Sequence, residues 1–107
     1  YLDDLVDAVL RLTENDCLES GIWNICAAPE TAVSVLDLAS MIQQCVNPNM
    51  PPKFNFVPYS MFGLYEDVRH RSGSAAKAKL MLGWEAKVGL NEGLMRSIDA
   101  LLKERKP

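Results

Sequence analysis

The sequence has little of what metal centres, redox motifs and membrane spans require. Its 107 residues include one histidine, His70, and no Cys-x-x-Cys pattern, so we expect no zinc site. The three cysteines are odd in number and widely spaced, which is typical of free thiols in a reducing cytoplasm. No apolar run approaches the ~20 residues that cross a bilayer, so we expect no membrane contact. The chain opens on Tyr1-Leu2 without a basic segment, so we also expect no signal peptide.

The motifs of a complete redox enzyme are also missing. No glycine-rich Gly-x-Gly-x-x-Gly or Gly-x-x-Gly-x-x-Gly turn is present to hold a dinucleotide. None of the three tyrosines is followed four residues later by lysine, so no Tyr-x-x-x-Lys pair exists. His70 lies between Arg69 and Arg71, a poor setting for a general base. We therefore expect no catalytic residue and no bound cofactor in this chain taken alone.

Charge is unevenly distributed along the chain. Residues 1–67 carry two basic side chains against ten acidic ones, whereas residues 68–107 carry nine basic against four acidic. The overall charge of −3 and the low aromatic content argue against a nucleic-acid partner. A local basic segment suits a small anion better, and for the lysines the alternative is a solvated helix surface.

Hydrophobic periodicity and turn residues predict a single α/β domain. Ser34 with Asp37 indicates a helix start, and Gly83 suits the left-handed position after a helix end. Strand, helix and strand within residues 22–57 form a βαβ unit, so we expect a small parallel sheet packed with several helices. The loop over residues 58–73 is long enough to indicate a binding role. The expected elements are helices at 2–14, 34–46, 75–82 and 90–104, and strands at 22–26 and 53–57.

Four motifs, in order, resemble the carboxy-terminal lobe of the extended short-chain dehydrogenases/reductases, the NAD-dependent nucleotide-sugar epimerase/dehydratase family. The opening helix is similar to His-Val-Asp-Asp-Leu-Val-Asp-Ala, and the following strand is similar to Gly-x-x-Tyr/Trp-Asn-Ile-Gly. The third motif is a tail signature that ends in Gly-Trp-Glu, and the fourth is the closing Leu-x-Glu-Gly-Leu. In this sequence they are residues 1–8, 21–25, 77–85 and 90–94.

Within that family, residues 65–71 look most like the loop of UDP-glucuronic acid decarboxylases and related epimerases. The resemblance implies that Arg71 binds the sugar nucleotide and that Tyr65 lines the site, with Arg69 as a further candidate. A guanidinium presents a planar fork suited to phosphate or carboxylate oxygens. The alternative is that Tyr65 packs and that both arginines pair with the neighbouring acids Glu66 and Asp67. Four positions depart from the pattern. Gly73 and Ala86 each replace a usual proline, Ser74 replaces a usual aspartate, and Cys26 replaces a usual glycine.

The resemblance implies that residues 1–107 are one substrate-binding domain of a Rossmann-type enzyme. The parent would be a homodimer whose upstream Rossmann domain binds NAD, and it would epimerise, dehydrate or decarboxylate a nucleotide-diphosphate sugar through a keto-sugar. Its class would be isomerase or lyase. If so, the apolar surface of this chain should be larger than usual, where the Rossmann domain would lie. The alternatives are a stand-alone binding or interaction module without catalysis, and a purely structural fragment.

Overall fold

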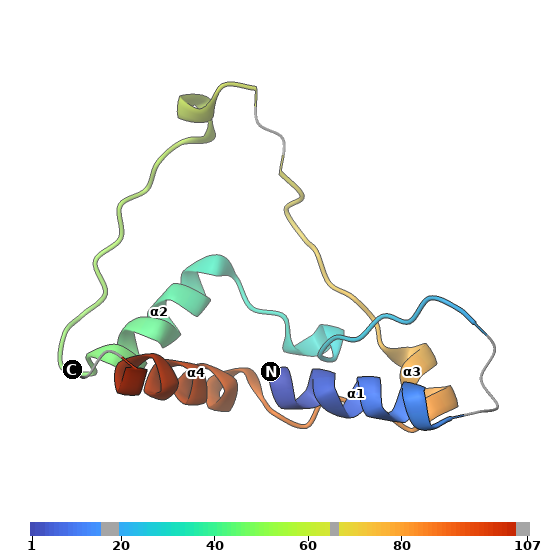
Figure 1. Cartoon of the computed structure of the whole chain (residues 1–107). Coiled ribbons are helices and arrows are strands. Elements are labelled where there is room, and N and C mark those ends of the chain that lie inside the picture. Colours follow the sequence, from blue (N-terminus) through green and yellow to red (C-terminus); the bar gives the residue numbers. More distant parts are fainter. Residues whose placement is uncertain (16–19, 65–66, 105–107) are drawn as a thin grey trace.

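The computed structural model describes residues 1–15, 20–64 and 67–104, and the regular structure in this part of the chain is helical (Figure 1). Two short 3-10 turns, Pro29–Thr31 and Tyr59–Phe62, were not predicted. The four predicted helices are present, with bounds that differ from the predicted ones by one residue at most. They are α1 (Leu2–Glu14), α2 (Val35–Val46), α3 (Ala76–Leu82) and α4 (Leu90–Glu104).

Local sequence signals explain two of the helix ends. The Ser34 hydroxyl oxygen accepts the backbone N–H of Asp37 at 3.0 Å, which confirms the predicted start of α2. Gly83 has φ 62°, in the left-handed region, and its backbone N–H donates to Lys79 O at 3.1 Å. The N–H of Trp84 donates to Ala78 O at 3.3 Å, which completes the closure of α3.

The predicted parallel sheet is wrong for the residues that the structure describes. Neither residues 22–26 nor residues 53–57 form a strand. The Ile22 carbonyl instead accepts the Lys77 ammonium at 2.9 Å, and residues 53–57 rise away from the helices (Figure 1). Local residue types favour extended backbone, but a sheet forms only where a partner strand lies alongside.

The chain is open rather than closely packed. Its radius of gyration is 17.9 Å, against about 13 Å for a compact domain of this length. Its accessible surface is 9282 Å², against about 5,900 Å² for a compact protein of this mass. The described residues between α2 and α3, 47–64 and 67–75, account for much of this openness, since they make a wide excursion from the helices (Figure 1).

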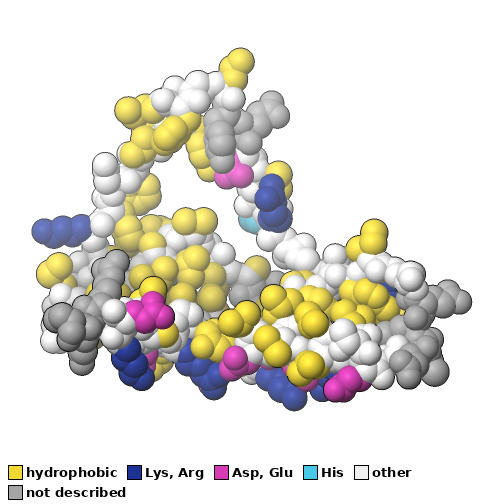
Figure 2. Space-filling model, in the orientation of Figure 1, with side chains coloured by type: hydrophobic (Ala, Val, Ile, Leu, Met, Phe, Trp, Pro, Cys, Tyr) yellow, Lys and Arg dark blue, Asp and Glu magenta, His cyan; other side chains and the backbone are white. Residues whose placement is uncertain are grey.

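Little of the apolar surface is buried. The described core consists of Ala8, Ala78 and Trp84, with Trp23 and Ile25 partly buried against it. The apolar stripe of α1 faces solvent, and the predicted buried faces of α2 and α4 are only partly covered. Many apolar side chains lie on the face shown in Figure 2. The expectation of an unusually large exposed apolar surface is therefore confirmed.

Candidate functional site

The most buried polar side chain among the described residues is that of Asp4, near the start of α1. Its two carboxylate oxygens accept the backbone N–H groups of Lys87 and Val88, each at 3.0 Å. Its backbone carbonyl accepts the indole N–H of Trp84, also at 3.0 Å. Asp4 is 7% exposed and Trp84 is 1% exposed, so these contacts are shielded from water. They tie α1 to the segment between α3 and α4.

The Asp4 carboxyl is held in its charged form. Burial alone raises its pKa, but the two backbone hydrogen bonds and nearby positive charge outweigh burial and leave the pKa below its ordinary value. A carboxylate that accepts two backbone N–H groups has a structural role. With both oxygens occupied, it is poorly placed to act as an acid or base.

Arg11 makes a second link between α1 and α3. Its Nη1 atom donates to Gly83 O at 2.9 Å and to Leu82 O at 3.2 Å, and its Nε atom pairs with Asp7 at 3.1 Å. The carboxyl end of a helix carries unpaired carbonyls and partial negative charge, which a guanidinium complements. Arg11 therefore has a structural role at the end of α3.

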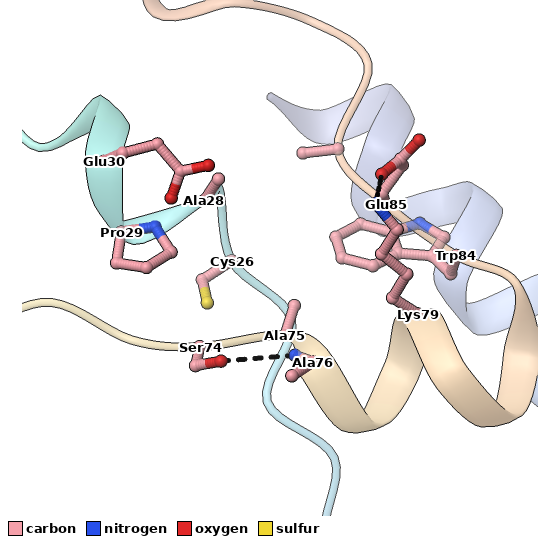
Figure 3. A pocket seen from close by; sticks show the side chains of 11 residues that line it. Cys26, Ala28, Pro29, Glu30, Ser74, Ala75, Ala76, Lys79, Trp84 and Glu85 are labelled. Atoms are coloured by element: carbon pink, nitrogen blue, oxygen red, sulfur yellow. Dashed lines mark hydrogen bonds and ion pairs between the residues drawn. The ribbon is translucent and has the colours of Figure 1, made fainter.

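A pocket of about 260 Å³ lies between residues 26–30, the start of α3 and the segment after Trp84 (Figure 3). Cys26 and Glu30 line one side, and Lys79 and Glu85 line the other (Figure 3). The volume is below the ~300 Å³ at which small-molecule sites usually begin. The pocket is therefore too small for a whole sugar nucleotide in this structure.

Two of the three charged side chains that line this pocket form an ion pair with each other. The Lys79 ammonium and the Glu85 carboxylate lie 2.6 Å apart. Their hydrogen bond raises the pKa of Lys79 and lowers the pKa of Glu85. Both side chains are well exposed to solvent, so this ion pair contributes little to stability.

Two of the positions that depart from the family pattern, Gly73 and Cys26, face each other. A Cβ atom added to Gly73 would lie 2.9 Å from the Sγ atom of Cys26, closer than real Cβ contacts. The absence of a side chain at Gly73 leaves room for the thiol at Cys26. Sequence reasoning noted each departure separately, and only the structure shows that they are neighbours.

The predicted substrate-binding residues Arg69 and Arg71 are not among the residues that line this pocket. Arg69 and Arg71 are exposed and pair with none of the described carboxylates, while Tyr65 lies outside the described residues. The Asp67 carboxylate accepts the Tyr59 hydroxyl at 2.9 Å and forms no ion pair with Arg69 or Arg71. The structure therefore brings no enclosed site together around the arginines.

The described residues show neither a metal-binding cluster nor a membrane-spanning helix. No group of three or more His, Cys, Asp or Glu side chains there could hold a metal ion. None of the helices described is both long enough and apolar enough to span a bilayer.

Comparison with known proteins gives a consistent result. The chain is 35% identical to UDP-glucuronic acid decarboxylase 5 of Arabidopsis thaliana and 34% identical to decarboxylase 3, in each case over 94 residues or 88% of this chain. It is 32% identical to decarboxylase 1 of the same organism over 98 residues. No family model and no solved structure matches.

The chain covers only a fraction of these relatives. It spans 25% of the length of decarboxylases 5 and 3, and 20% of the length of decarboxylase 1. The matches nevertheless extend over 88 to 92% of this chain. The chain is thus a relative of the UDP-glucuronic acid decarboxylases and fits the carboxy-terminal lobe of that branch of the extended short-chain dehydrogenases/reductases.

Proposed function

We propose that this chain is the substrate-binding portion of a nucleotide-sugar decarboxylase, and that its ligand is UDP-glucuronic acid. The observation that carries the proposal is the similarity to UDP-glucuronic acid decarboxylases over 88% of the chain. In this proposal the chain binds and orients the sugar nucleotide, and it supplies no catalytic group. Epimerisation and dehydration are the other outcomes open to the same fold.

The loop chemistry supports an anionic ligand. The guanidinium groups of Arg69 and Arg71 are two residues apart, exposed, and unpaired with described carboxylates. UDP-glucuronic acid carries a diphosphate and a carboxylate, both of which match the planar donor fork of arginine. We assign the main contact to Arg71, with Arg69 secondary and Tyr65 lining the same site.

In this proposal, NAD is bound by another part of the polypeptide and not by this chain. NAD supplies hydride transfer in such chemistry, and its binding requires a glycine-rich turn that the sequence does not contain. The residues of this chain therefore do not fit NAD, which a Rossmann domain of the same polypeptide would hold. The contribution of this chain is to position the sugar and to exclude water from it.

Isothermal titration of the chain with UDP-glucuronic acid tests the proposal. We expect saturable binding that weakens with added salt, since the contact is between exposed charges. Arg71→Ala should weaken binding by about tenfold or more, the loss expected for one charge-assisted hydrogen-bonded contact. Arg69→Ala should weaken it less.

A matched control removes a cation far from the loop. Lys103 lies in the last turn of α4, and Lys103→Ala should leave the affinity unchanged. The proposal fails if the chain shows no saturable binding, or if Lys103→Ala and Arg71→Ala weaken binding equally. Equal weakening would mean that the ligand is attracted by positive charge in general and not by a specific contact with Arg71.

A further inference from the structure

The segment that leads into α3 presents a serine directly after its two arginines. Ser72 follows Arg71, and Arg69 lies three residues before it. Residues 67–74 are exposed and form no helix or strand. No backbone group of these residues bonds to the backbone of another described residue. Ser72 therefore lies in an exposed segment that another protein can bind on both sides of the serine.

The spacing of the arginines from Ser72 matches the requirement of one class of enzyme. Arginine-directed serine/threonine kinases have acidic side chains that bind guanidinium groups on the amino-terminal side of the acceptor, most often three residues before it. Arg69 occupies that position relative to Ser72. Neither Arg69 nor Arg71 forms an ion pair with a described carboxylate, so a partner meets no such competition for them.

A second serine, Ser74, also follows an arginine by three residues, and the structure distinguishes the two. The Ser74 hydroxyl oxygen accepts the backbone N–H of Ala76 at 3.3 Å. Ser74 also lines the pocket beside Cys26, whose charged side chains are two glutamates and one lysine (Figure 3). A phosphate on Ser74 would therefore meet net negative charge. Ser72 is not among the residues that line this pocket, which favours Ser72 as the acceptor.

We propose that Ser72 accepts a phosphoryl group from ATP through an arginine-directed kinase, and that the resulting phosphate binds the guanidinium group of Arg71. In the transfer, the Ser72 hydroxyl oxygen bonds to the γ-phosphorus of ATP. The bond between that phosphorus and the oxygen that bridges it to the β-phosphate breaks, and ADP leaves. The hydroxyl proton passes to the catalytic base of the kinase.

The phosphate reverses the charge of the segment and occupies an arginine. Residues 67–73 carry one acidic and two basic side chains, a net charge of +1 with His70 neutral. A phosphoserine adds about −1.5 to −2 charges at pH 7 and three acceptor oxygens, so the segment becomes negative. Because the phosphate is attached to the same segment, it competes with a free anion at an effective concentration on the order of millimolar. If the proposed function holds, phosphorylation therefore displaces the sugar nucleotide from Arg71.

Phosphorylation of the full chain in vitro tests the acceptor. The chain is incubated with magnesium-ATP and the catalytic subunit of the cyclic-AMP-dependent kinase, which is arginine-directed, and fragmentation mass spectrometry locates the phosphate. We expect phosphate on Ser72, and Ser72→Ala should abolish it. Arg69→Ala should lower the rate about tenfold or more, the loss expected for one charge-assisted contact. Ser74→Ala is the matched control and should leave the rate unchanged. Absence of phosphate, or phosphate on Ser74 in place of Ser72, overturns the proposal.

Phosphorus NMR of the modified chain tests the contact with Arg71 without any added ligand. The second pKa of the phosphoserine should be lower in the unaltered chain than in Arg71→Ala, because a guanidinium group favours the dianion. Arg71→Ala keeps Arg69, so the kinase still modifies it. Equal pKa values in the two chains would show that the phosphate does not bind Arg71.

Titration with UDP-glucuronic acid measures the consequence for the proposed function. The phosphorylated chain should bind about tenfold or more weakly than the unmodified chain. Kinase-treated Ser72→Ala should bind as the unmodified chain does. Equal affinities with and without phosphate on Ser72 would overturn the displacement of the ligand. Absence of binding by the unmodified chain would refute the proposed function, while the mass spectra and the phosphorus NMR would still decide the acceptor and its contact.

Discussion

At the scale of single residues, Asp4 shows what the sequence could and could not reveal. An aspartate in the first turn of a helix can complement the helix dipole from an exposed position. The structure instead buries it, with both carboxylate oxygens bonded to the chain 83 and 84 residues away. A signal was present, because Asp4 shares a helical face with Ala8 and Arg11, the residues that contact α3. Its partners could not be predicted, since Lys87 and Val88 contribute only backbone groups.

Replacing Asp4 with asparagine should destabilise the fold. The variant keeps the shape, but its amide group turns a donor toward one of the two backbone N–H groups, and that donor stays unpaired. We expect a loss of about 1.5–3 kcal/mol, the range for hydrogen bonds to charged groups. Urea unfolding followed by circular dichroism measures it. Asp3→Asn is the control, because Asp3 makes only an exposed ion pair with Arg96, and it should cost less than about 1 kcal/mol.

The same carboxyl predicts a pH dependence. Its pKa is lower in the folded chain than in the unfolded one, so its stabilisation is present above the ordinary carboxyl pKa. That stabilisation is lost as the pH falls through the lowered value. The difference in stability between the unaltered chain and Asp4→Asn should therefore shrink in acid. A difference that stays constant from neutral pH to acid would show that the charge of Asp4 does not matter.

At the scale of elements, the helices were predictable and the strands were not. Helix ends depend on residues close in sequence, such as Ser34 at the start of α2 and Gly83 at the end of α3, so a short window contains the information. A strand depends on a neighbour that is distant in sequence. Residues 22–26 and 53–57 have suitable residue types, but nothing local could indicate that they would remain apart.

Arg11 should determine whether α3 is stable. A helix of seven residues is too short to persist alone in water, and this one is held by Trp84 and by the guanidinium at its carboxyl end. Arg11→Met keeps the apolar stem and removes both bonds to the carbonyls of Leu82 and Gly83. We expect a loss of about 1–2 kcal/mol and faster amide exchange within residues 79–84.

The control for that experiment is another arginine on a helix. Arg96→Met removes exposed ion pairs with Asp3 and Glu92 and should leave exchange in α3 unchanged. Equal acceleration in both variants would mean that α3 responds to global stability. Unchanged exchange in Arg11→Met would refute the proposed role of the guanidinium.

At the scale of the whole molecule, the open shape explains why the candidate site could be only partly predicted. The loop, its arginines and its position after the strand-like segment were all evident from the sequence. Whether those arginines face a ligand depends on which part of the protein lies opposite them. Figure 1 shows that the described part of the excursion loops away from the helices. The guanidinium groups are therefore present and exposed, while an enclosing wall is not formed by the described residues.

The central claim is that the loop around Arg71 binds the sugar nucleotide. Chemical-shift mapping with UDP-glucuronic acid tests it most directly, because it reports where the ligand binds. The account predicts saturable shifts at the backbone amides of residues 69–71 that disappear in Arg71→Ala, with little change at Cys26 or Lys79. Shifts centred on the pocket beside Cys26 and Lys79, or shifts in the loop that persist in Arg71→Ala, would contradict it.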